Sequence, residues 1–190
     1  RLKQIMMSNG DPTERQLKII NTGLISKYTN RWDRKKMKYL HESIEHPVVD
    51  IDDLSAMFGE VYVNRMRTPK LILKGLNLLE CAIDFDGTIM STVATLNIRS
   101  DSAEMLCVLG SIINSSVMTE YCKSKYISSS YCGGLLFTPD MINRLPVPDL
   151  SDMGQWRDVV ERVLCLMSEG GDRAIEAELD AMIRCRLLAE

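Results

Sequence analysis

Two aspartates, Asp84 and Asp86, are the residues of this sequence whose types and spacing best fit catalysis. They follow an apolar run, and residues i and i+2 of an extended segment project on the same side. One carboxylate could therefore attack an electrophile while the other transfers a proton. The pair Asp86-Gly87 between two strand-like runs is also a strong signal for a hairpin turn. We favour the turn.

The run Asp84-Phe85-Asp86-Gly87-Thr88 resembles the D-x-D-G-T motif of haloacid-dehalogenase-like phosphatases. The resemblance implies that Asp84 is a nucleophile and Asp86 an acid/base. Such enzymes place the motif near the start of a doubly wound parallel sheet, and a later acidic pair follows a strand and binds magnesium. Here the downstream acids Asp172 and Asp180 have no apolar strand leading to them. A phosphatase is therefore the alternative enzyme hypothesis.

Other catalytic and metal-binding patterns are absent from the sequence. There is no G-x-S-x-G, H-E-x-x-H or Walker A motif. The six cysteines form no C-x-x-C pair, and only two histidines could complete a metal site. We expect reduced thiols in a cytoplasmic protein, with no catalytic residue, no metal and no cofactor on this chain. The cysteines are Cys81, Cys107, Cys122, Cys132, Cys165 and Cys185.

The net charge of −3 hides a polarised distribution of charge along the chain. Basic residues exceed acidic ones by 14 to 9 over residues 1–75, whereas acidic residues exceed basic ones by 10 to 5 over residues 149–190. Residues 27–38, which we call the basic segment, hold six basic residues and one acid. This segment could bind phosphates, while its two aromatic rings pack on sugars or stack on bases. The predicted contacts are Lys27, Tyr28, Arg31, Trp32, Arg34, Lys35 and Lys36.

The alternative for the basic segment is a solvated helix that Trp32 and Met37 anchor to the core. A second predicted contact region is the polar loop at residues 123–134, where hydroxyl groups could read base edges; its alternative is a flexible surface loop. The loop contacts are Lys123, Lys125, Ser128, Ser129, Ser130 and Tyr131, and a phosphate track along the first strands adds Arg65, Arg67, Lys70 and Lys74. Strand alternation places Lys70 and Lys74 on one side.

These candidate residues are predicted to sit on an α+β fold. Residues 61–67, 68–74, 78–83 and 88–98 are short runs rich in β-branched residues, which predict a mostly antiparallel sheet. A short helix is expected at residues 14–20, and helical spacing predicts a helix over residues 101–121 that packs on the sheet. Two further amphipathic stripes, separated by Gly170-Gly171, predict a C-terminal antiparallel helical hairpin.

A stiff extended segment precedes that hairpin. Pro146 and Pro148 each fix φ, and each disfavours a helical residue before it, so residues 145–148 form a proline strap. No apolar run approaches the roughly 20 residues of a membrane span, and we expect no membrane partner. The chain begins with Arg1 rather than Met, which favours a piece of a longer protein. The predicted parts are residues 1–60 and 61–148 of one module, followed by the hairpin at 149–190.

The order of these elements resembles the C-terminal specificity domain of the TaqI-like family, found in bacterial N6-adenine DNA methyltransferases and type II restriction enzymes fused to them. The likeness rests on the Pro-Lys strand at residues 68–73, the strand and turn at 81–87, and a Ser/Thr-containing strand at 90–93. It continues with the helix at 109–115, the proline strap and the closing helix at 175–180. The acidic balance and the ending Cys185-Arg186-Leu187-Leu188, in place of Tyr-Gly-Leu, depart from the family's pattern.

The resemblance implies a target-recognition domain that binds double-stranded DNA and performs no catalysis itself. A catalytic methyltransferase domain in the same polypeptide would bind S-adenosylmethionine and flip the adenine, and no Asn-Pro-Pro-Tyr-type motif of that domain occurs here. The acidic helical hairpin then braces the fold. In an alternative from a different class, the hairpin docks a protein partner or the catalytic domain, which requires an exposed apolar patch.

Overall fold

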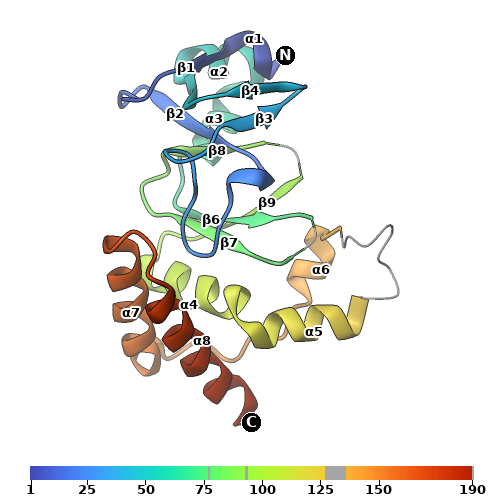
Figure 1. Ribbon diagram of the computed structural model, residues 1–190, viewed down its shortest axis with the longest axis vertical. Helices are drawn as coiled ribbons and strands as arrows, with labels where there is room; N and C mark the ends of the chain where they lie inside the picture. Colours follow the sequence, from blue (N-terminus) through green and yellow to red (C-terminus); the bar gives the residue numbers. More distant parts are fainter. Residues whose placement is uncertain (77, 93, 127–135, 190) are drawn as a thin grey trace.

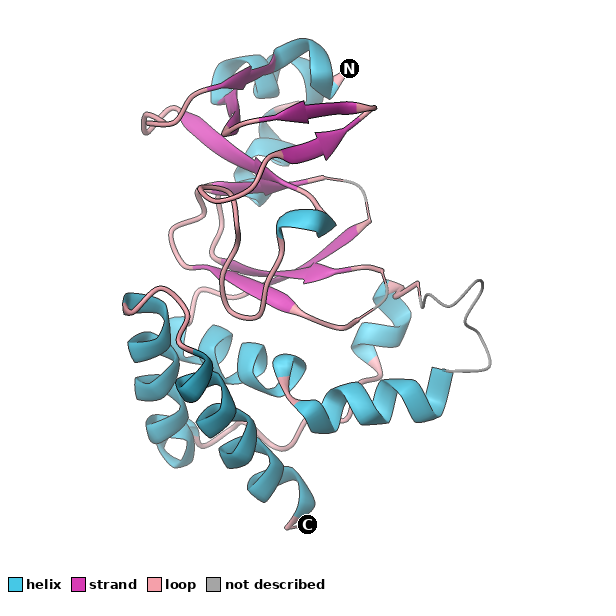
Figure 2. Cartoon of the chain, viewed as in Figure 1, coloured by secondary structure: helices cyan, strands magenta, loops and turns pink. Residues whose placement is uncertain are grey.

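The computed structural model describes residues 1–76, 78–92, 94–126 and 136–189. The chain forms layers: two sheets lie nearest the N-terminus, a third sheet follows, and most of the helices cover the far side of that third sheet (Figures 1 and 2). Both helices and mostly antiparallel sheets are present, so the predicted α+β class is confirmed. The sheets and helices separate by layer because each sheet face or helix stripe must cover an apolar surface.

The upper layer holds a four-stranded sheet with the order β1-β5-β2-β8 and a two-stranded sheet. Its pairings are antiparallel except between β2 and β8, which run parallel. The predicted helix at residues 14–20 is wrong, because Leu17 and Ile19 alternate with less buried residues and enter the core from a strand. The strands are β1 (Met6–Ser8), β2 (Gln16–Ile20), β3 (Met37–Tyr39), β4 (Glu42–Ile44), β5 (Pro47–Asp50) and β8 (Ile89–Ser91).

Three helices belong to this layer: α1 (Leu2–Ile5), α2 (Ile51–Phe58) and α3 (Glu60–Met66). Asp50 caps α2 by accepting a hydrogen bond from the Asp52 amide, and Gly59, with φ 89°, separates α2 from α3. The predicted strand at residues 61–67 is therefore wrong. The β-branched Val61 and Val63 favoured a strand, but only Val63 is buried, as on one stripe of a short helix.

The middle sheet has the antiparallel order β7-β6-β9, from β6 (Lys70–Lys74), β7 (Cys81–Asp84) and β9 (Thr95–Arg99). Alternate residues of β6 enter different cores: Leu71 and Leu73 pack toward the helices, whereas Ile72 packs toward the upper sheet. The predicted Asp86-Gly87 hairpin is wrong, since β7 pairs with β6 and β8 pairs with β2. The turn instead links two sheets.

The helical layer begins with α4 (Ala103–Asn114) and α5 (Ser116–Tyr126), where one helix was predicted. Ser102 caps α4, and the chain bends at Ser115. Gly110 allows α4 to approach the middle sheet, because a Cβ there would lie 3.3 Å from the Ile83 Cδ1 atom.

The proline strap follows α6 (Pro139–Asn143) and has no regular secondary structure. After η3 (Met153–Trp156), α7 (Arg157–Ser168) and α8 (Arg173–Leu188) form the predicted antiparallel hairpin around Gly170 and Gly171. Within the described residues no single helix is long and apolar enough to cross a membrane, and the one pair that passes together, α4 and α5, is bent by 56°.

Candidate nucleic-acid interface

The basic segment is an irregular loop fixed against the edge of the middle sheet. It follows η1 (Thr22–Leu24), and the Tyr28 amide donates to the Cys81 carbonyl at 2.8 Å while the Ile83 amide donates to the Tyr28 carbonyl at 3.0 Å. Tyr28 has φ 65°, a conformation that residues with a side chain rarely adopt. The two hydrogen bonds to β7 hold it there.

The two aromatic residues of the segment anchor it to the core. Tyr28 and Trp32 are 3% and 1% exposed, and the Trp32 indole donates to the Pro47 carbonyl at 2.9 Å. Burial raises the pKa of Tyr28 above its usual value, although a hydrogen bond with Ser111 opposes the shift. These rings are not available to stack on bases, so the prediction that they contact DNA is wrong. The expected helix is also wrong, whereas the anchoring by Trp32 and Met37 is confirmed.

Three cations of the segment remain exposed and held by uncharged groups. The Arg31 Nε donates to the Ser26 hydroxyl at 2.8 Å, and the Lys35 Nζ to the Gly23 carbonyl at 3.2 Å. The Arg34 guanidinium donates to the Gly170 carbonyl at 3.3 Å. None of the three forms an ion pair within the described part of the chain, whereas Lys36 pairs with Glu45 at 2.9 Å. Their contacts therefore orient positive charge without neutralising it.

The structure also brings Lys27 beside Lys123 of α5, since both line one surface pocket together with Glu80 and Glu120. Lys125 lies nearby in the sequence; its ammonium donates to the Tyr121 hydroxyl at 2.7 Å, which raises the pKa of Lys125. The other predicted loop contacts, Ser128, Ser129, Ser130 and Tyr131, lie outside the described residues. Part of the second contact region thus adjoins the first.

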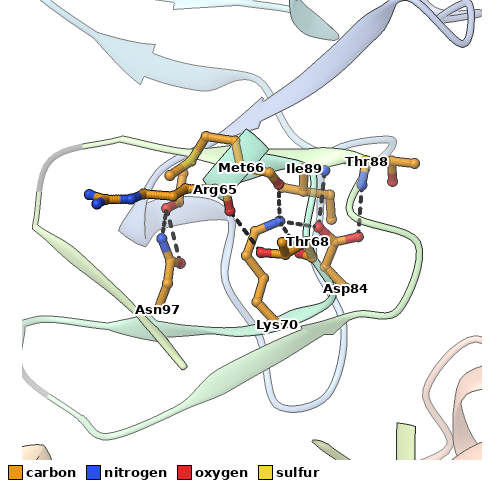
Figure 3. A network of polar contacts seen from close by, with 9 residues as sticks. Arg65, Met66, Thr68, Lys70, Asp84, Thr88, Ile89 and Asn97 are labelled. Atoms are coloured by element: carbon orange, nitrogen blue, oxygen red, sulfur yellow. Dashed lines mark hydrogen bonds and ion pairs between the residues drawn. The ribbon is translucent and has the colours of Figure 1, made fainter. Parts of the chain in front are cut away.

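The predicted phosphate track divides into buried and exposed residues. Lys70 is 0% exposed and its ammonium pairs with the Asp84 carboxylate at 2.6 Å (Figure 3), so the prediction that Lys70 contacts phosphate is wrong. Burial lowers the pKa of Lys70, and Asp84 opposes that shift. Lys74 is half-buried and pairs with Glu80 at 3.0 Å. Arg65 and Arg67 are exposed.

The Asp84 carboxylate is enclosed by the protein and is not open to a substrate. Its side chain is 3% exposed, and besides Lys70 it accepts hydrogen bonds from the amides of Thr88 and Ile89, both at 3.1 Å (Figure 3). The following Gly87 has φ 63°, and a Cβ there would lie 2.0 Å from the Arg67 carbonyl oxygen. The motif therefore builds a tight turn around a buried Asp84, and this geometry does not favour a phosphoryl-transfer nucleophile.

Asn114 connects the helical layer to the basic segment, a role that sequence reasoning missed. Its carboxamide accepts from the Cys81 amide at 2.8 Å and donates to the Cys81 carbonyl at 3.0 Å. That carbonyl also accepts from the Tyr28 amide. A polar residue at the end of the apolar stripe of α4 was the available signal.

Neither the protein-family models nor the curated proteins compared with this sequence contain a match. In the described part of the chain, no three His, Cys, Asp or Glu side chains group as a metal site would require.

Proposed function

We propose that this chain is a DNA target-recognition domain that binds duplex DNA through the basic segment. The observation that carries the proposal is that Arg31, Arg34 and Lys35 are exposed, each donate to an uncharged group, and form no ion pair within the described residues. Cations that carboxylates do not neutralise can meet phosphates, and phosphate contacts set the position of a protein on a duplex. Lys27 and Lys123 add two cations at the α5 side of the segment, in a pocket that Glu80 and Glu120 also line.

The order of elements that resembles TaqI-like specificity domains supports the finer assignment. In this proposal the chain serves a cytoplasmic bacterial restriction-modification enzyme or N6-adenine DNA methyltransferase, with or without an attached endonuclease. S-adenosylmethionine binds to the catalytic domain, and this chain contributes selectivity without catalysis. The phosphatase alternative requires an accessible Asp84, and that carboxylate already satisfies Lys70 and two amides.

Docking of the catalytic domain is a second role, which one observation favours. An apolar groove runs between α5, the proline strap and the end of α8, lined by Val117, Tyr121, Val147 and Leu187 among others. Val147 in this lining is 42% exposed. An exposed apolar groove of this kind fits a protein surface better than a phosphate backbone.

The test of DNA binding uses fluorescence anisotropy of a labelled mixed-sequence duplex over a range of salt concentrations. Arg31→Gln combined with Lys35→Gln should weaken binding by at least about tenfold and reduce the salt slope by roughly two, since two phosphate contacts are lost. Arg157→Gln combined with Arg162→Gln removes the same charge from α7 and should change neither quantity appreciably. Equal effects of the two double variants would show that net charge, and not the basic segment, governs binding.

A further inference from the structure

A row of three charged residues crosses the middle sheet. In the antiparallel register Lys70 of β6 lies directly opposite Asp84 of β7 and Arg99 of β9, so all three side chains share one face. Asp84 neutralises Lys70 at 2.6 Å. Arg99 is exposed and has no ion pair within the described residues. Burial lowers the pKa of Lys70, and the positive charge of Arg99 lowers it further. The row therefore ends in an uncompensated positive charge at one sheet edge.

The same lysine fixes the end of α3 beside that charge. The Lys70 ammonium donates to the Met66 carbonyl at 2.5 Å and to the Thr68 carbonyl at 3.2 Å, and the Thr68 hydroxyl donates to the Arg65 carbonyl at 2.9 Å (Figure 3). These contacts hold the final turn of α3 against β6. Arg65 consequently has a fixed backbone next to the sheet edge, while its guanidinium is exposed.

Arg65 and Arg99 line one open groove. Other polar groups on its wall come from Asn64 of α3, Thr68 of the following turn, and Ser100 and Asp101 after β9. Arg65 has no carboxylate partner in the described ranges either. Two planar guanidinium groups with neighbouring amide and hydroxyl groups suit a tetrahedral anion, because each can donate two parallel hydrogen bonds to phosphate oxygens. The exposed Asp101 opposes an anion, but solvent and salt screen its charge.

From these observations we infer that the groove between α3 and the end of β9 binds a phosphate group, with Arg65 and Arg99 as its two cationic ligands. The phosphodiester of a DNA strand is the expected source, and this part rests on the proposed function. An open groove admits a diester, whose chain must leave on both sides. Arg99 was not among the residues that sequence reasoning selected.

The groove is a separate contact from the basic segment. Tyr28 bridges to β7, whereas Arg99 belongs to β9, and these strands are the opposite edges of the sheet β7-β6-β9. Two strand spacings, about 10 Å, therefore separate the edges. The losses of duplex-binding free energy caused by variants in the groove and in the basic segment should therefore add, as expected for independent sites.

The experiment compares Arg65→Gln, Arg99→Gln and Asp101→Asn in the full 190-residue chain, with Arg157→Gln as the matched control. Each of the first two should weaken duplex binding about three- to tenfold and lower the salt slope by about one, whereas Asp101→Asn should strengthen binding. Arg99→Gln also removes a charge that repels Lys70, so its thermal midpoint should equal or exceed that of the parent. Lost binding then reflects the groove and not unfolding.

A second arm uses inorganic phosphate alone and follows amide chemical shifts by NMR. Shifts at residues 64–68 and 99–101 that disappear in Arg99→Gln support the site. If these shifts occur while no variant alters duplex binding, the site takes a small phosphate compound and the nucleic-acid source is rejected.

The inference and the proposed function can fail separately. If Arg31→Gln with Lys35→Gln weakens duplex binding while Arg65→Gln and Arg99→Gln do not, and phosphate shifts no groove amide, the groove inference is overturned and the proposed function stands. If no variant alters duplex binding and phosphate shifts no groove amide, both the groove inference and the proposed function are rejected.

Discussion

Lys70 and Asp84 form a buried ion pair whose side chains are 0% and 3% exposed. Taking two charges out of water costs several kcal/mol each, and attraction repays this only when further hydrogen bonds satisfy both groups. Here the Lys70 ammonium also donates to two carbonyl oxygens, and the Asp84 carboxylate also accepts from two amides. The pair thus fastens α3, β6 and the turn after β7 to one another.

Asp84→Ala should lower the free energy of unfolding by about 3–5 kcal/mol, since it leaves a buried ammonium unpaired. Asp86→Ala, two residues away and exposed, should stay within about 0.5 kcal/mol of the parent. Urea denaturation measures both. A small effect at Asp84, or an equal effect at the two positions, would contradict the structural role assigned to Asp84.

The buried groups Cys81 and Tyr28 should make the fold sensitive to alkali. Burial raises the pKa of each above its usual value of 9.0 for the thiol and 10.0 for the phenol. The unfolded chain then loses these protons first, so stability is full below pH 9 and falls as pH rises, by up to about 1.4 kcal/mol per pH unit and group.

Denaturation curves at pH 8, 9 and 10 measure this loss. Cys81→Ala should flatten the dependence, whereas alanine at the exposed Cys185 should not. A parent protein equally stable at all three values would contradict the burial of the two groups.

At the scale of elements, α4 positions the basic segment through a single residue of β7, Cys81. Asn114 binds both the amide and the carbonyl of Cys81, and the same carbonyl receives the Tyr28 amide. The helix, the strand β7 and the loop are consequently linked in series. Loss of the carboxamide should loosen the loop more than a general loss of stability would.

Asn114→Ala should cost about 1–3 kcal/mol, because it leaves the buried Cys81 amide without a partner. Hydrogen exchange should also accelerate at residues 25–31. Leu179→Ala in α8 is the control, since it destabilises the core but leaves the Asn114 carboxamide, and so its two hydrogen bonds to Cys81, in the chain. Equal protection of residues 25–31 in the two variants, compared at matched stability, would rule out a positioning role for Asn114.

The sequence patterns predicted the helices of the C-terminal hairpin and the two strands at the centre of the middle sheet. The stripes of α7 and α8, and the short apolar runs of β6 and β7, confirmed their predictions. The short segments failed: α3 contains two β-branched valines but buries one, and the Asp86-Gly87 turn joins strands of different sheets. Such cases are decided by contacts with residues far along the chain, and the local propensity of a segment carries no information about those contacts.

The candidate site was predictable in its charge but not in its geometry. The density of Lys and Arg marked the basic segment, yet which side chains are buried depends on partners far along the chain. Trp32 reaches Pro47, and Lys70 reaches Asp84. Arg99 was missed for the same reason, because it lies near Arg65 only once β9 has paired with β6.

Across the whole molecule, positive charge is concentrated in the first part of the chain and negative charge in the C-terminal hairpin. The basic residues gather in the first part, whereas the acidic hairpin of α7 and α8 packs on α4, the helix that covers the far side of the middle sheet (Figure 1). The acidic helices disfavour binding of DNA on their own surface, whereas the groove and the basic segment, whose Arg34 reaches the Gly170 carbonyl at the turn of the hairpin, favour it. The modest net charge is therefore compatible with a local DNA-binding surface.

The salt dependence of duplex binding by the unaltered chain tests the central claim most directly. Lys27, Arg31, Arg34 and Lys35, with Arg65 and Arg99, supply six cations, so a plot of the logarithm of the association constant against that of the salt concentration should have a slope of about −5. A slope near zero, or no duplex binding at low salt, would contradict the account.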